Sequence, residues 1–411
     1  MDVIYPRCAA IDVHKRTAVV SVGWVGEDGQ RHRQTRTFST MTADLRRLGK
    51  WLAEQGVTHV AMESTGVYWR PIFNLLEEQC TVVLANAAHV KAVPGRKTDV
   101  RDSEWLLDLM QHGLIRGSFI PPAPIRELRD LTRHRTSLVQ ERTRAVNRIH
   151  KVLEDANIKL AAVATDLLGV SGRRMLEALI AGETAPAALA DLARGRLRRK
   201  QAALQQALEG RVRPHHQVLL RELLAQIDYL DGAIARLSAA ITVCTQPFAT
   251  AVELLCSIAG IQQRTAEVML AETGPDMRRF PSARHLCSWA AICPGNRESA
   301  GKQRSGRTRQ GNRWLRSALL QAAWAAIRIS DGYLGAQFRR LAKRRGAKRA
   351  AVAVAHSLLT IIYHVLHKGV PYADLGADYF DRQHPDQLAQ YHVRRLAELG
   401  YDVSLAPSPA A

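Results

Sequence analysis

The chain has few cysteines and no paired ones. Its 411 residues include six, and no two of them form a C-x-x-C pair. They are Cys8, Cys80, Cys244, Cys256, Cys287 and Cys293. This spacing argues against a zinc ribbon and against a disulfide framework. We therefore expect reduced thiols in a cytoplasmic protein.

Long apolar runs and internal repeats are also lacking. The sequence contains no uninterrupted run of about 18 apolar residues, the length that would span a bilayer. Its first residues show no basic region followed by an apolar stretch, as a secretory leader would. No repeat of about 20–50 residues occurs, which argues against solenoid architectures. We expect a globular protein that is neither secreted nor membrane-spanning.

Negative charge is scarce relative to positive charge. Lysine and arginine total 58 against 38 aspartates and glutamates, which gives a formal net charge of +20. The excess is spread over several segments, so it predicts attraction to a polyanion along much of the chain. Nucleic acid is the expected partner. A hydrophobic content of 46% and the length leave room for two or three domains with cores of their own.

Residues 1–120 have the pattern of an α/β domain, because strand-rich runs alternate with helical periods. The expected strands lie in Cys8–Trp24, Gln34–Phe38, His59–Glu63 and Thr81–Asn86, and the expected helices are Met41–Gln55, Trp69–Glu78 and Asp102–His112. A turn signal, Gly26-Glu27-Asp28-Gly29, predicts antiparallel strands before the chain crosses over through a helix. That order suits a ribonuclease-H-like sheet. Prolines 121, 122 and 124 mark the end of the domain.

Residues 121–247 are predicted to be helical. An apolar stripe between Leu128 and Leu153 is flanked by arginines, which predicts a basic amphipathic helix. A second stripe alternates spacings of three and four residues, as a coiled-coil seam does. It consists of Leu220, Leu223, Ile227, Leu230, Ile234, Leu237 and Ile241. The seam favours either a parallel pairing with a second copy or an antiparallel hairpin with the Leu128–Leu153 helix of the same chain.

Residues 248–370 form a third, helical and basic segment, and residues 371–411 form an amphipathic tail. Within the third segment, Leu255–Leu270 has the pattern of a helix-hairpin-helix, whose turn can offer backbone N–H groups to a DNA phosphate. Such hairpins usually carry a second glycine where this chain has Gln262. A purely structural pair of helices is the alternative.

Four acidic residues stand where strands end or helices begin. Asp12 lies inside an apolar strand, Glu63 ends another, and Asp99 and Asp102 are three residues apart at an expected helix start. Converging carboxylates repel one another unless a cation such as Mg²⁺ neutralises them. We therefore predict that these four residues bind metal and act in catalysis. The alternative for Asp99 or Asp102 is a helix cap.

A basic segment at 294–317 is the second candidate site. Glycines and serines in its first half predict a loop, and a helical period resumes at Trp314. A serine among guanidinium groups could attack a phosphate, and local sequence alone does not choose between Ser299 and Ser305. A solvated contact with phosphates is the alternative. The predicted nucleic-acid-binding residues, including two from a basic helix downstream, are Lys302, Arg304, Arg307, Arg309, Arg313, Arg316, Arg344 and Arg345.

The two sites together resemble a known family. An Asp12…Glu63…Asp99-x-x-Asp102 pattern followed by Ser299-Ala300-Gly301-Lys302 and Gly311-Asn312-Arg313-Trp314 is similar to the DEDD-type transposases of the IS110 insertion-sequence family, relatives of the Piv DNA invertases. The resemblance covers about residues 8–370. It implies a RuvC-like N-terminal domain, a coiled-coil middle and a helical C-terminal transposase domain.

The resemblance also implies a mechanism and partners. The four acids would bind Mg²⁺, and Ser299 would attack DNA. A structured non-coding RNA would guide the choice of donor and target DNA. The protein would act as a homo-oligomer, a dimer or tetramer, in which the acidic domain of one subunit meets the serine loop of another.

Two other classes of function remain open from the residues themselves. One is a metal-dependent, RuvC-like junction nuclease in which water, not serine, attacks the phosphate. The other is a non-catalytic scaffold whose basic helices bind nucleic acid and whose acids are structural.

Overall fold

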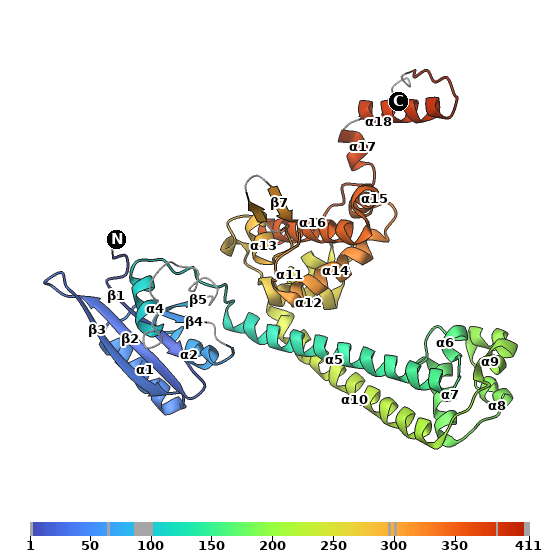
Figure 1. Cartoon of the computed structure of the whole chain (residues 1–411), viewed down its shortest axis with the longest axis horizontal. Helices are drawn as coiled ribbons and strands as arrows, with labels where there is room; N and C mark the ends of the chain where they lie inside the picture. Colours follow the sequence, from blue (N-terminus) through green and yellow to red (C-terminus); the bar gives the residue numbers. More distant parts are fainter. Residues whose placement is uncertain are drawn as a thin grey trace. The chain divides into compact units, whose positions relative to one another are not determined.

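The computed structural model describes residues 3–63, 66–85, 102–294, 297–299, 302–383 and 385–406. The chain forms two compact units, residues 1–120 and 121–411. The first unit is a sheet with helices, and the described part of the second is helical with one two-stranded ribbon (Figure 1).

The first unit is built on a five-stranded sheet with the strand order β3-β2-β1-β4-β5. Its strands are β1 (Arg7–Val13), β2 (Thr17–Val25), β3 (Arg31–Ser39), β4 (His59–Glu63) and β5 (Thr81–Ala85). The first three are antiparallel neighbours, and β4 and β5 run parallel to β1, as the turn signal and the crossover predicted. The expected run Cys8–Trp24 is two strands joined by a tight turn, in which the His14 N–H donates to the Thr17 carbonyl at 2.9 Å.

Each face of the sheet has its own core. Helices α1 (Thr42–Glu54) and α2 (Trp69–Leu76) cover one face, where Ile11 and Met62 are buried. Helix α4 (Asp102–Gln111) packs on the other face against Ala10 and Ala61. Side chains alternate between the two faces along each strand. The face of any strand residue therefore follows from its spacing to a residue in one of the two cores.

The second unit begins with a long helical hairpin. Helix α5 (Ala123–Asp155) starts in the predicted proline boundary and runs antiparallel to α10 (Pro214–Thr245). Arg142 Nε lies 2.5 Å from Asp231 Oδ1 near the middle, and Asp155 Oδ2 lies 2.7 Å from His216 Nε2 at the end. Figure 1 shows the two helices side by side.

The predicted seam is therefore used within the chain. Leu230 and Ile234 pack with Leu138 of α5, and five of the seven seam residues are buried. The other two, Leu223 and Leu237, are partly buried against the same cores. The antiparallel hairpin, one of the two alternatives, is the pairing that the structure contains.

A cluster of short helices closes the far end of the hairpin. They are α6 (Leu160–Val163), α7 (Val170–Ala181), α8 (Pro186–Asp191), the 3-10 helix η1 (Gly195–Lys200) and α9 (Gln201–Leu208). Their apolar residues form one core with the ends of α5 and α10, in which Ile149 and Met175 are fully buried.

The other end of the hairpin leads into a helical bundle. Its elements are η2 (Gln246–Phe248), α11 (Ala249–Cys256), α12 (Gln263–Thr273), η3 (Met277–Arg279), α13 (Ala283–Trp289), the ribbon strands β6 (Arg297–Ser299) and β7 (Lys302–Ser305), α14 (Arg313–Ile327), α15 (Tyr333–Arg345) and α16 (Ala347–Lys368). Helix α16 packs against α11, α13, α14 and α15. The tail follows as α17 (Tyr379–Gln383) and α18 (Pro385–Glu398).

Two stretches of the described chain pass a length-and-composition test for membrane helices: Pro214–Cys256 and α16. In α16 half of the apolar window is buried within the protein. The α10 part of the first stretch carries the seam that packs on α5. Packing within the protein thus accounts for half of the window in α16 and for the seam residues of α10, whereas 22% of the first window as a whole is buried.

The α11–α12 pair is a helical hairpin whose turn faces inward. Gly260 has a φ of +86°, and a Cβ at this position would lie 2.4 Å from the Ala322 carbonyl oxygen and 2.7 Å from the Ala326 nitrogen of α14. Only glycine allows this approach. The turn is thus packed on α14 at Gly260, which favours the structural alternative over phosphate binding there.

We predict that Ile149→Ala lowers the free energy of unfolding by about 2–5 kcal/mol, because it leaves a cavity in the core that closes the hairpin. Val243→Ala on α10 is the matched control. Its side chain is 63% exposed, so its effect should stay within about 0.5 kcal/mol. Urea unfolding followed by circular dichroism measures both, and equal effects would contradict this packing.

Candidate active site

Strand register brings Asp12 and Glu63 together. The parallel β1–β4 pair aligns Ala10 with Ala61 and Ile11 with Met62. The next residue on each strand is the carboxylate, so the two stand side by side at the carboxyl ends of neighbouring strands. Both point to the Ala10–Ala61 face, because side chains alternate along each strand. Ligands of α/β sheets collect at this end of the strands.

Helix α4 adds Asp102 to the same face. Asp102 is the first residue of α4, and its Oδ1 atom is buried. It precedes Leu106 by four residues, and Leu106 packs in the core with Ala10 and Ala61. Residues four apart share one side of a helix, so Asp102 lies on the side of α4 that covers the sheet. Asp99, the fourth predicted acid, lies outside the described residues.

The three described carboxylates fit a hard divalent cation. The Asp12 side chain is 23% exposed, and its Oδ2 lies 3.2 Å from His14 Nε2. Carboxylate oxygens are the ligands that Mg²⁺ and Ca²⁺ prefer, and negative charges held on one face need a positive partner. Asp102 also suits its place at a helix start, because an acidic first turn favours the helix dipole.

The predicted serine loop is a two-stranded ribbon. Strands β6 and β7 are antiparallel, and a bridge between Pro294 and Thr308 closes the base. The expectation of a loop was wrong here, because backbone pairing orders a sequence without the apolar alternation that predicts strands. Ser299 pairs with Lys302 at one end of the ribbon, whereas Ser305 pairs with Arg297 at the end nearer the Pro294–Thr308 bridge. The structure thus separates two serines that the sequence left equivalent.

The ribbon returns to the helices through three consecutive attachments. Arg309 Nη2 donates to Ser288 Oγ at 3.1 Å. A Cβ at Gly311 would lie 2.5 Å from Ala291 Cβ, so the backbone at Gly311 packs too closely on Ala291 to leave room for a side chain. Asn312 then caps α14. Its Oδ1 accepts from the backbone N–H groups of Trp314 and Leu315, at 3.1 Å each. The ribbon therefore has a fixed base.

The predicted nucleic-acid-binding residues lie on exposed positions of the second unit where their side chains are described. Arg307, Arg309 and Arg313 are exposed, and Arg316 is partly so. Arg344 and Arg345 are exposed in the last turn of α15. Lys302 and Arg304 belong to β7. Exposed guanidinium groups suit phosphate binding, since they can donate to two oxygens at once.

Glu272 is a buried carboxylate that sequence reasoning did not single out. It has no exposed side-chain surface and accepts hydrogen bonds from Arg133 and Asn312. Glu272 directly follows the apolar run Val268–Ala271, and an acid next to such a run is the same kind of signal as Asp12 in its strand. That signal could have found it.

Comparison with known proteins places the chain in a family. One family model, described as "Transposase", matches residues 9–158, and a second, described as "Transposase IS116/IS110/IS902 family", matches residues 252–339. Together they cover more than half of the chain. The chain belongs to the IS110 family of transposases. Membership of this DEDD-type family implies a divalent metal, in agreement with the clustered carboxylates.

Similar proteins support the assignment. A "Probable family 20 transposase" of Pseudomonas aeruginosa is 27% identical over 76% of this chain and 85% of its own length. A protein of Sinorhizobium fredii that carries a transposase name is 26% identical over 80% of this chain and 77% of its own. The "Pilin gene-inverting protein" of Moraxella bovis is 30% identical over 42% of this chain and 53% of its own.

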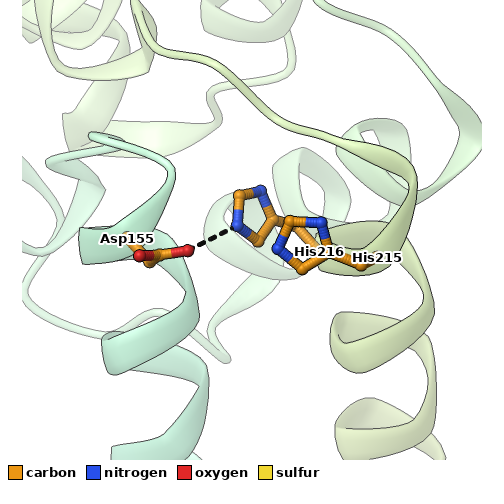
Figure 2. Close-up of side chains that lie close together, drawn as sticks. All are labelled: Asp155, His215 and His216. Atoms are coloured by element: carbon orange, nitrogen blue, oxygen red, sulfur yellow. Dashed lines mark hydrogen bonds and ion pairs between the residues drawn. The ribbon is translucent and has the colours of Figure 1, made fainter.

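A second group of possible metal ligands lies in the helical hairpin. Ligand atoms of Asp155, His215 and His216 lie within 4.8 Å of one another (Figure 2). Yet both His216 nitrogens are occupied: Nδ1 accepts from the Arg213 N–H at 3.1 Å, so Nε2 carries the proton that it donates to Asp155 at 2.7 Å. A metal on Nε2 would displace that proton and leave an imidazolate, which is unfavourable. The group caps α10 and joins it to α5.

We predict that His216→Ala lowers the free energy of unfolding by about 1–2 kcal/mol, because it removes the acceptor that caps α10. His215→Ala is the matched control, since His215 is the exposed neighbour.

The bond to His216 also lowers the pKa of Asp155, so the contribution of this pair should be present at neutral pH and be lost as the pH falls below about 4. Thermal unfolding from pH 7 to pH 3 measures both effects. Stabilisation of the wild type by added Zn²⁺ would contradict this assignment.

Proposed function

We propose that the chain is an insertion-sequence transposase that cuts and rejoins DNA with metal-binding carboxylates and a serine nucleophile. The observation that carries the proposal is the β1–β4 register, which sets Asp12 beside Glu63 on the face that α4 covers. A site-specific rearrangement of DNA is also what the name of the Moraxella relative describes.

The first unit is proposed to be RuvC-like. Its order β3-β2-β1-β4-β5, with three antiparallel strands followed by parallel ones, supports a ribonuclease-H-like sheet. Asp12 and Glu63 then stand at the ends of its two central paired strands. The helical hairpin of α5 and α10 is the counterpart of the coiled-coil middle, and the bundle from α11 to α16 is the counterpart of the transposase domain.

Mg²⁺ would be held by Asp12, Glu63 and Asp102. Asp99, three residues before Asp102 in the sequence, would be the fourth ligand. When bound, the ion supplies charge that polarises the scissile phosphate and stabilises the departing oxygen. The carboxylates would fix its position, and they stand next to the core that α4 forms with Ala10 and Ala61.

Ser299 is the proposed nucleophile. Its Oγ gives its proton to solvent water and attacks phosphorus, the bond from phosphorus to one DNA oxygen breaks, and that oxygen takes a proton from solvent water and leaves as a hydroxyl. A hydroxyl of the new DNA partner then attacks the phosphoserine and regenerates the serine. Lys302, Arg304, Arg307 and Arg309 orient the phosphates, and their charge stabilises the transition state.

Guide RNA and self-association belong to the same proposal. A net charge of +20 suits contact with RNA as well as DNA, and Arg313, Arg316, Arg344 and Arg345 would track a phosphate backbone. A homo-oligomer would join the acidic unit of one copy to the ribbon of another. Sequencing of RNA that co-purifies with the protein, compared with the DNA flanking its gene, tests the guide.

We predict that Ser299→Ala abolishes a covalent protein–DNA adduct, because the alanine has no oxygen to attack phosphorus. Ser305→Ala is the matched control on the opposite strand and should keep the adduct. A denaturing gel of the protein incubated with labelled DNA from the ends of its own element makes the measurement. An adduct with Ser299→Ala would sink the assignment, and free cleaved ends without any adduct would support the water-using nuclease.

We predict that Asp12→Asn and Glu63→Gln each lower recombination in cells by about a hundredfold or more, because each removes a charge that the cation requires. Asp44→Asn is the control, an acid of the same unit that pairs with Arg47 on the surface of α1. Junction-specific amplification of recombined DNA gives the frequency. Undiminished recombination in both variants would favour the non-catalytic scaffold.

A further inference from the structure

A buried carboxylate ties three helices together at the base of the ribbon. Glu272 lies in the last turn of α12, and its side chain has no exposed surface. Arg133 of α5 binds it with both branches of the guanidinium group, Nε to Oε1 at 2.7 Å and Nη2 to Oε2 at 2.8 Å. Asn312, at the start of α14, donates from Nδ2 to Oε2 at 2.5 Å.

A second arginine of α5 also binds this end of α12. Arg129, one turn before Arg133, donates from Nε to the Ala271 carbonyl at 3.0 Å and from Nη2 to the Glu272 carbonyl at 2.8 Å. The last carbonyls of a helix have no partner within the helix, so Arg129 satisfies groups that would otherwise be left unpaired. Backbone and side chain of Glu272 are thus both held by α5.

Asn312 has one possible orientation in this network. Its Oδ1 accepts from the Trp314 and Leu315 N–H groups, so Nδ2 is the atom that faces Glu272. A carboxylate only accepts hydrogen bonds, which fits the amide nitrogen and excludes the flipped amide. One side chain therefore caps α14 and at the same time fixes that cap to Glu272.

The network lies where the ribbon ends. The ribbon closes at the Pro294–Thr308 bridge, and the chain reaches Asn312 four residues later. Gly311, between them, is packed at close range on Ala290 and Ala291. The short segment from Thr308 to Asn312 thus connects the base of the ribbon to the cap of α14. Helix α5, on the other side of Glu272, is the helix into which the chain runs from the first unit.

We propose that Glu272 is a positioning residue for the serine ribbon. Through Asn312 it fixes where the ribbon joins α14, and through Arg133 it fixes that junction to α5, so that Ser299 is presented in one place. The proposal rests on the proposed function for its effect on catalysis. A buried ion pair adds little to stability compared with apolar packing, and its best-attested use is to specify one arrangement.

A second buried pair supplies a matched control. Arg135 Nη2 and Glu267 Oε2 lie 2.7 Å apart, with side chains 4% and 3% exposed. This pair also joins α5 to α12, and the further partner of Glu267 is Gln263 in α12 itself. A substitution in this pair weakens the link between α5 and α12 but removes no bond to Asn312.

The decisive variant is Asn312→Asp. Aspartate is as good a helix cap as asparagine, so α14 keeps its start, but a carboxylate now faces Glu272. Asn312→Ser keeps a cap and removes the donor without adding charge, which serves if Asn312→Asp does not fold.

We expect Asn312→Asp to form the covalent DNA adduct at least about tenfold more slowly per folded molecule than the wild type. Glu267→Gln should stay within about threefold of the wild type. The probe is labelled DNA from the ends of the element, and circular dichroism gives the folded fraction. A wild-type rate in Asn312→Asp, or an equal loss in Glu267→Gln, would overturn the proposal.

Trypsin cleavage within Lys302–Arg309 gives a readout that needs no DNA. A junction that Glu272 positions should become more open to cleavage in Asn312→Asp and Asn312→Ser than in the wild type or Glu267→Gln. Equal cleavage in all four proteins would overturn the role of Glu272. If the wild type forms no adduct, the proposed function fails, and trypsin cleavage still decides the positioning role.

Discussion

The candidate site of the first unit depends on two carboxylates that stand on adjacent parallel strands. Neighbouring strands lie about 4.8 Å apart, so the register that aligns Ile11 with Met62 leaves Asp12 and Glu63 on adjacent strand ends, where like charges disfavour each other. A slip of the register by one residue would turn Ile11 and Met62 out of their core. The register is thus held by apolar packing, and the charges of the two carboxylates suit the cation that we propose.

Glu272 shows the opposite solution to the same physical problem. Its charge is fully buried, and the protein itself neutralises it with a bidentate arginine and an amide. Asp12, by contrast, has an exposed histidine as its neighbour. A carboxylate that is satisfied by its own chain has a structural use, whereas several carboxylates gathered on one face of a sheet suit a metal. The distinction also applies to Asp155, whose histidine partner is already fully hydrogen-bonded.

Sequence reasoning succeeded where a pattern has one structural meaning. Alternation in His59–Glu63 predicted a strand that ends on its acid, and the strand has those bounds. The heptad spacing of Leu220–Ile241 fixed the apolar side of α10, but it could not choose the partner, because a seam packs equally well on another copy or on α5. The ribbon was missed because its polar, basic strands do not alternate. Glu272 was missed because a glutamate in a helix is usually on the surface.

Backbone pairing also gives the two serines different mechanical settings. Ser305 is three residues from Thr308, where the bridge closes the base, and the attachments of Arg309, Gly311 and Asn312 follow directly. Ser299 pairs with Lys302, at the end of the ribbon farthest from those attachments. The nucleophile that we propose has to reach a phosphate of duplex DNA, and the far end of a ribbon can approach such a surface where its base cannot. A small rotation at the base displaces that far end most, so a rigid junction at Asn312 matters more for Ser299 than for any residue near the base.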